Sequence, residues 1–456
     1  MLSFLAVVLQ VQWQLSEEDT SNITSSVFLG AMVGTLVLGP LGDIIGRKPV
    51  FSLTAGIIAI FGLSTALANE VKTLILMRFL VGFGVGGLTV PFDTLAEFIP
   101  TSHRGTQLMV IEYFWTFGTI LTPIIAYFTL GNGEAGVDQN AWRWFVVFCS
   151  LPCLISTVFG MIFVPESPRW LLAREEHTKA LAILRQAAQT NGKDPEILFP
   201  TGTRLIDEEE HGHDFCHLLS PQWRPKTIFL WVTWAGFAFV YFGTILLVTL
   251  VFANMQQSAG DQNNNNNAGA NVYTFDYEAI LTSAVSEVAG CTLVILIIDR
   301  IGRIPTQIGS FIAGGITVFT LCLLANSGDP SRAGLIVTAF LARMFFMSGS
   351  CTTWVATAEL LSTEVRTTGH SASNAMARLG GSFSPYLITS STPYPLIGSV
   401  MLLLSLVTAF AVWHLPETMG KTLGATAHEQ PIEKCYTKEQ EGCTSVVLVP
   451  YGIFRE

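Results

Sequence analysis

The sequence predicts an all-α membrane protein with twelve transmembrane helices in two six-helix halves. Charged residues make up 13% of the chain, about half of their share in a soluble domain, and the mean hydropathy is +0.49. The apolar residues occur in blocks of about 20, the length that a helix needs to cross a bilayer. Short motifs also recur in the same order in both halves, as in carriers built by internal duplication.

The duplication is visible in three motifs that each occur twice, at separations of 256, 262 and 251 residues. The pairs are Asp43-x-x-Gly46-Arg47 with Asp299-x-x-Gly302-Arg303, Glu97 and Arg104 with Glu359 and Arg366, and Val164-Pro165-Glu166-Ser167 with Leu415-Pro416-Glu417-Thr418. Because the order and the spacings agree, we infer that one ancestral unit was used twice.

Eleven apolar segments are expected to span the membrane. They lie at 21–41, 50–68, 73–95, 106–129, 142–163, 227–252, 278–298, 305–326, 333–356, 369–390 and 394–414. A twelfth, Met1 to Val11, rises only about 16 Å, half of a hydrocarbon core. Its duplicate at 227–252 has full length, so the first helix is expected to be truncated by a missing or misannotated start. A signal peptide is the alternative, but neither a basic region nor a small-residue cleavage site accompanies the segment.

The loops that carry the motifs are expected to face the cytosol, because basic residues concentrate in cytosolic loops. These residues are Arg47, Lys48, Arg104, Arg300, Arg303 and Arg366, whereas the opposite loops hold only Lys72, Arg143 and Arg332. The expected organisation is a first half at 1–163, a cytosolic linker at 164–226, a second half at 227–414 and a cytosolic tail at 415–456.

The linker is expected to contain an amphipathic helix that lies against the cytosolic ends of the bundle. Ser167 before Pro168 is a helix start signal. An apolar stripe of helical spacing follows at Leu171, Leu172, Ala180, Leu181 and Leu184. On the opposite side, residues 254–277 include the run Asn263 to Asn267 and are expected to be a disordered insertion.

The loop Gly39-x-x-x-Asp43-Ile44-x-Gly46-Arg47-Lys48 resembles the signature between the second and third helices of the major facilitator superfamily. Pro165-Glu166-Ser167-Pro168-Arg169-Trp170 and Pro416-Glu417-Thr418 resemble the sugar-porter signatures of that superfamily. Three further stretches resemble its synaptic-vesicle-protein-related branch, namely Arg78 to Gly87, Ile111 to Trp115 and Gly369 to Gly380. The resemblance implies a major facilitator fold and a carrier of a small organic solute, such as an organic ion, an organic acid or a sugar, coupled to protons by symport.

The duplicated charges are expected to gate the cytosolic end, because partly shielded ion pairs can favour one of two conformations. The resemblance implies the same role, with Ile44 in place of the usual arginine as a weaker first copy. The gating residues are Asp43, Arg47, Glu97, Arg104, Glu166, Asp299, Arg303, Glu359, Arg366 and Glu417. Solvated surface pairs are the alternative.

Charged residues inside apolar segments are candidates for proton coupling, because they are costly to bury. Glu112 or Glu287 would carry the proton, and the resemblance links Arg78 to coupling. Glu287 and Arg378 fall near the middle of their helices and are expected to face the central cavity or to pair with each other. A buried pair that only fixes helix packing is the alternative.

Aromatic residues are expected to line the path of the solute together with Arg378. The candidates are Trp115, Tyr241, Trp354 and Trp234. Two facing tryptophans would suit a flat or cationic solute, although plain packing explains aromatic residues equally well. His370 is expected to have no special role.

Other classes of function find no support in the sequence. It contains no nucleophile with a partner base, no phosphate loop, no metal cluster and no cofactor motif, and a net charge of -10 does not indicate nucleic-acid binding. The predicted partners are the solute, protons and the lipid bilayer. A transporter-like vesicle receptor that moves nothing and a truncated, inactive carrier remain alternatives. The sequence leaves plasma membrane, vesicle and vacuole open.

Overall fold

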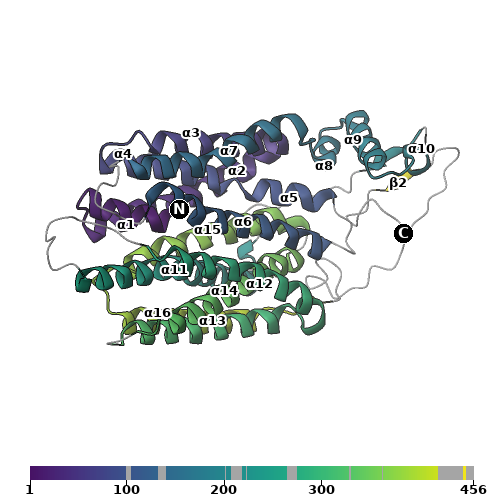
Figure 1. Cartoon of the computed structure of the whole chain (residues 1–456). Helices are drawn as coiled ribbons and strands as arrows, with labels where there is room; N and C mark the ends of the chain where they lie inside the picture. Colours follow the sequence, from purple (N-terminus) through teal and green to yellow (C-terminus); the bar gives the residue numbers. More distant parts are fainter. Residues whose placement is uncertain are drawn as a thin grey trace.

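Helices form nearly all of the part of the chain that the computed structural model describes. The described residues are 1–98, 104–131, 140–200, 202–206, 218–221, 223–263, 275–327, 330–361, 363–419 and 445–447. Figure 1 shows two groups of long helices that lie side by side, with the first group above the second. The asparagine run from 264 onward, the Asp207 to Glu210 segment and most of the tail lie outside the described residues.

The first group contains α1 (Leu2–Gln12), α2 (Glu17–Ile45), α3 (Arg47–Thr65), α4 (Val71–Gly86), α5 (Thr89–Phe98), α6 (Arg104–Leu130) and α7 (Ala141–Phe163). The second contains α11 (Arg224–Asn263), α12 (Tyr277–Ile301), α13 (Arg303–Ala325), α14 (Arg332–Leu360), α15 (Thr363–Leu387) and α16 (Tyr394–Trp413). Between them lie α8 (Pro168–Ala173), α9 (His177–Thr190), α10 (Pro195–Leu198) and β1 (Arg204–Ile206), which pairs in parallel with β2 (Ser445–Val447).

Ten helices of the described chain are long and apolar enough to cross a membrane. One of these spans, Val71–Phe92, combines α4 with the start of α5. The short α1 and the more polar α15, which has 25 residues, complete two sets of six. The predicted all-α fold is therefore confirmed in its helix order, and its first helix, α1, has 11 residues.

The two groups repeat the same packing. The pair α2 and α4 corresponds to α12 and α14, and the pair α3 and α7 corresponds to α13 and α16. Glycine makes the first crossing very close, because a Cβ atom added at Gly82 would lie 2.0 Å from the carbonyl oxygen of Val27. The two groups meet along α2 with α15 and along α6 with α12. We call these contacts the α2–α15 seam and the α6–α12 seam.

Both copies of the glycine motif end one helix and begin the next. Gly46 has φ 107° and Gly302 has φ 103°, a region that glycine adopts at little steric cost. These turns lie at the end of the bundle that also carries α8 to α10, on the right in Figure 1. We call it the motif end, and the other end the opposite end.

Two details of the prediction were wrong. The segment expected to be disordered from 254 onward continues α11 as far as Asn263. The linker helix is divided between α8 and α9, where Glu175 has φ 61°, although Leu171, Leu172, Ala180 and Leu184 are buried as expected. The span Val71–Phe92 agrees with the expected segment 73–95, and the backbone turns within it at Gly87 and Leu88, between α4 and α5. As predicted, Ser167 caps α8 by accepting a hydrogen bond from the N–H of Trp170.

Candidate functional site

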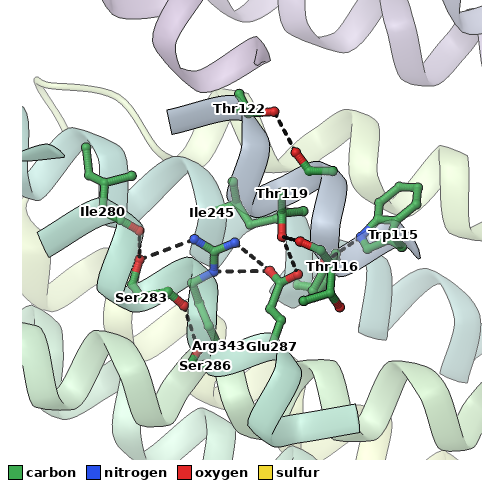
Figure 2. Close-up of polar contacts among 12 residues, drawn as sticks. Trp115, Thr116, Thr119, Thr122, Ile245, Ile280, Ser283, Ser286, Glu287 and Arg343 are labelled. Carbon is green, nitrogen blue, oxygen red and sulfur yellow. Dashed lines mark hydrogen bonds and ion pairs between the residues drawn. The ribbon is translucent and has the colours of Figure 1, made fainter. Parts of the chain in front are cut away.

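A buried ion pair lies at the centre of the second half. Arg343 of α14 donates to Glu287 of α12 through Nε, at 3.2 Å, and through Nη2. The Nη1 atom of Arg343 also donates to Ser283, at 3.2 Å. Glu287 is fully buried and Arg343 is 4% exposed. Figure 2 shows the guanidinium between Ser283 and Glu287.

The same glutamate joins the two halves. Thr119 of α6 donates to the second oxygen of Glu287, at 2.8 Å, as Figure 2 also shows. Nearer the motif end, the hydroxyl groups of Tyr113 and Thr292 lie 2.8 Å apart across the same contact. The α6–α12 seam is therefore a row of polar contacts, and one of them depends on the charge of Glu287.

Pairing of Glu287 with Arg378, one of the two expected arrangements, does not occur. Arg343 takes that place, and the sequence analysis missed it. It lies within the apolar segment 333–356, so the rule that selected the other intramembrane charges applies to it equally. Arginine can bind both a carboxylate and a nearby hydroxyl with its planar set of donors, which explains why it reaches Glu287 and Ser283 together.

Arg378 lies on the face of α15 that meets α2. One turn toward the motif end, Asn374 donates to Thr35 of α2 at 3.5 Å. One turn the other way, the carbonyl oxygen of Ser382 accepts a hydrogen bond from Ser25. Residues four apart on a helix share a face, so Arg378 occupies the middle of the α2–α15 seam. It is 8% exposed, and no ion pair joins it to any described residue.

The other proton-coupling candidates have different surroundings. Arg78 of α4 is 2% exposed, and its Nη1 atom donates a hydrogen bond to the Sδ atom of Met1, at 3.7 Å. Glu112 shares the α6 face of Thr116 and Thr119 and is close enough to Glu287 for their charges to repel. Within the described chain, Glu112 has no ion pair. Of the two candidate carboxylates, only Glu287 is held by a cation.

The aromatic candidates form two groups instead of one facing pair. Trp115 donates to the hydroxyl of Tyr241 at 2.8 Å and belongs to the contact between α6 and α11. Trp234 donates to Thr357 at 2.9 Å, and its ring lies 4.9 Å from that of Trp354. Each group therefore joins different helices.

His370 belongs to the second aromatic group, which the sequence analysis did not foresee. Its ring centre is 4.9 Å from Trp354 and 5.5 Å from Trp234. Phe92 of α5 contacts both Trp354, at 5.1 Å, and His370, at 5.8 Å. Because Phe92 belongs to the first half, this cluster closes the space between the halves near the motif end. The sequence signal was weak, because these residues come from four separate helices.

The gating candidates form the same arrangement twice. Glu166 accepts from the backbone N–H of Arg47, at 2.8 Å, and Glu417 accepts from that of Arg303, at 3.0 Å. Carboxylates at these helix N-termini are stabilised by the unpaired N–H groups and the helix dipole. Each glutamate therefore fixes the start of the helix that follows a glycine turn.

The charged side chains of these turns are also paired. Arg47 lies 2.8 Å from Asp43 and Arg303 lies 3.0 Å from Asp299. Arg303 additionally binds Glu359 through two hydrogen bonds of 2.9 Å. The side chains of Glu97, Arg104 and Arg366 lie outside the described ones, so their predicted pairing stays a prediction.

Glu417 has a perturbed ionisation. Burial opposes its charged form, but four backbone N–H donors outweigh this effect and hold the pKa of the carboxyl below its ordinary value. The donors are Arg303, Ile304, Met419 and Thr418. The charged form of Glu417 is therefore part of the folded turn.

Comparison with known proteins agrees with this architecture. The profile of the family described as "Sugar (and other) transporter" matches residues 3–428. The Synaptic vesicle 2-related protein of Xenopus laevis is 30% identical over 443 residues, which cover 94% of this chain and 77% of that protein. The Organic cation/carnitine transporter 7 of Arabidopsis thaliana is 27% identical over 420 residues, 84% of this chain and 80% of that one.

Solved structures show the same fold. The xylose transporter XylE from E. coli, in a partially occluded inward open conformation, superposes with a TM-score of 0.68 at 20% identity. The match covers 92% of this chain and 94% of that one. The relatives and the apolar helices identify an integral, multi-pass membrane transporter. The chain belongs to the sugar (and other) transporter family.

Proposed function

We propose that this chain moves a small organic solute by alternating access, in symport with protons, and that Glu112 carries the proton. One observation carries the choice of residue. Glu287 is bound by Arg343 and Thr119, whereas Glu112 has no ion pair among the described residues. Protonation of Glu287 would leave the buried guanidinium of Arg343 without a counter-charge, which is costly. Glu112 can gain and lose a proton without breaking such a pair.

The position of Glu112 supports coupling to the movement of the halves. It lies about two turns into α6 from the motif end, on the face that meets the second half. Protonation of Glu112 would remove the repulsion between its charge and that of Glu287 across the α6–α12 seam. The protonated state therefore favours a closed seam, and the charged state favours separation. Such a dependence is what a two-state carrier requires.

The names of similar proteins support a small organic solute. One relative is named as a carrier of organic cations and carnitine, and one solved neighbour is a proton:xylose symporter bound to 6-bromo-6-deoxy-D-glucose. We place Trp115, Tyr241, Trp234 and Trp354 beside the solute, with Arg378. We also propose that the motif end, the linker 164–226 and the tail 415–456 face the cytosol, and that the membrane is that of a vesicle, as the first relatives' names suggest.

Reconstituted vesicles would test the coupling. The probes are labelled benzoate, benzyltrimethylammonium and xylose, which represent an organic acid, an organic cation and a sugar. Accumulation driven by a pH gradient should fall to background in Glu112→Gln, while exchange of labelled for unlabelled probe should persist, because exchange needs no net proton movement. Retained accumulation in this variant would contradict the assignment. Binding without flux of any probe in the unaltered protein would instead indicate a receptor.

A further inference from the structure

The buried interior of the bundle carries more cations than anions among the described side chains. The arginines Arg78, Arg343 and Arg378 are each less than 9% exposed. The buried carboxylates of the described chain are Glu287, which pairs with Arg343, and Asp276, which caps α12 and pairs with Arg332. Arginine remains protonated in proteins. Arg343 is neutralised by Glu287, so the charges of Arg78 and Arg378 are left without a carboxylate in this part of the chain.

The duplicated motifs allow the two seams to be compared position by position. The α6–α12 seam has an acid, whereas the corresponding position of the α2–α15 seam, which contains Arg378, has none. Glu287 stands 12 residues before Asp299, and the residue 12 positions before Asp43 is Ala31. Arg378 stands 12 residues after Arg366, and its equivalent after Arg104 is Thr116. Each seam thus carries one charged residue at the same level.

The two charges differ in how they are compensated. At the α6–α12 seam the acid is Glu287, and its partner Arg343 comes from the same half. At the α2–α15 seam the base is Arg378, and α2 offers the methyl group of Ala31 at the matching level. An unpaired charge is costly to bury, so a site of this kind is stabilised when a mobile anion supplies the missing charge.

We propose that the solute is an organic anion and that its carboxylate binds Arg378 in the α2–α15 seam. This inference rests on the transport function proposed above and narrows its substrate class. A guanidinium binds a carboxylate through two parallel hydrogen bonds. Arg378 is 8% exposed in this structure, so the anion would reach it when the halves separate. One carboxylate and the proton on Glu112 enter together without net transfer of charge.

Matched probes test the charge class. The unaltered protein in vesicles would be given benzoate and butyrate, the neutral benzamide and butyramide, and the cations benzyltrimethylammonium and butyltrimethylammonium. We expect uptake and thermal stabilisation by a carboxylate and by neither analogue. Arg378→Gln should weaken this response about 10- to 100-fold, the loss expected for charge-assisted hydrogen bonds, and Arg378→Lys should recover part of it.

A second pair of variants keeps Arg378 in place. Met32 lies on α2 one turn from Phe28 and one turn from Thr35. Phe28 lies next to Gly381 of α15, and Thr35 accepts a hydrogen bond from Asn374 of α15. Met32→Glu adds a carboxylate of similar length, which should compete with the anion and weaken its response. The neutral Met32→Gln should not.

The outcomes separate the two proposals. Uptake of a cation or an amide in place of the carboxylates leaves transport intact and overturns the anion inference. Stabilisation by carboxylates without any flux leaves the anion site intact and overturns transport. If no carboxylate acts in either assay, or if Arg378→Gln responds like the unaltered protein, the inference is wrong.

Discussion

Arg343 binds one oxygen of Glu287 inside the second half, and the other oxygen of Glu287 accepts a hydrogen bond from Thr119 of the first half. This carboxylate therefore serves an ion pair and an inter-half contact together. The corresponding position of the first half, Ala31, can do neither. The two halves are alike in packing and differ in where they carry charge.

The ion pair predicts a non-additive effect on stability. Glu287→Met or Arg343→Met alone leaves the other charge buried and should lower the free energy of unfolding by about 3–5 kcal/mol. The double variant removes both charges and should be more stable than either single variant. Thermal midpoints of the purified proteins in detergent would measure this. Additive losses would show that the two residues act independently.

The capping glutamate Glu417 predicts a dependence of stability on acid. The pKa of Glu417 is lower in the folded chain than its ordinary value, so its contribution is present above the unfolded pKa and is lost as the pH falls through the folded pKa. The thermal midpoint should therefore decrease in the acidic range.

Substitution separates this contribution from other acidic groups. Glu417→Gln should lower stability by about 1–2 kcal/mol near neutral pH, through loss of charge-assisted caps, and should reduce the slope in acid. Glu166→Gln is the matched variant of the first half. An unchanged slope in Glu417→Gln would exclude this carboxyl as the source.

The glycine turns predict a strict requirement at two positions. A Cβ atom at Gly46 would lie 2.5 Å from Glu166, and one at Gly302 would lie 2.7 Å from Glu417. Alanine at either position should cost about 1–3 kcal/mol through a strained backbone and a displaced cap. Gly309→Ala, where a Cβ meets no atom within 4 Å, is the control for a glycine inside a helix. Equal stability of all three variants would contradict the turn geometry.

The α2–α15 seam offers a position for an engineered disulfide that would join the two halves reversibly. A Cβ atom added at Gly39 would lie 4.0 Å from the Cβ of Ser371, within the range for a disulfide. Gly39→Cys with Ser371→Cys should form a bridge at the motif end that stops uptake until a reductant is added. Each single cysteine variant controls for the substitution itself. Undiminished uptake by the bridged protein would exclude separation of this seam during transport.

The sequence was sufficient for the fold because its signals are local. Apolar length, the glycine turns and the duplicated offsets each depend on a short stretch, and the caps of Glu166 and Glu417 follow from motif order. The pairing of buried charges depends on three-dimensional packing. Arg343 and Glu287 come from different helices, and nothing in their spacing distinguishes that pair from Glu287 with Arg378.

The aromatic cluster was missed for a similar reason. Phe92, Trp234, Trp354 and His370 belong to four separate helices, and only their arrangement in space joins them. A lone histidine near a helix end carries no such information. The side chains of Glu97, Arg104 and Arg366 lie outside the described ones, so that part of the gate rests on the motif alone.

The most direct test of the account follows protons during solute entry. Vesicles that contain the protein and an internal pH indicator would receive benzoate or butyrate, with the membrane potential clamped. The acidification of protein-free vesicles, which the neutral acids cross by diffusion, would be subtracted. Net acidification of the interior with solute uptake is expected for the unaltered protein, and Glu112→Gln should exchange solute without moving protons. Equal acidification in Glu112→Gln and the unaltered protein would contradict the assignment of Glu112 as the proton carrier.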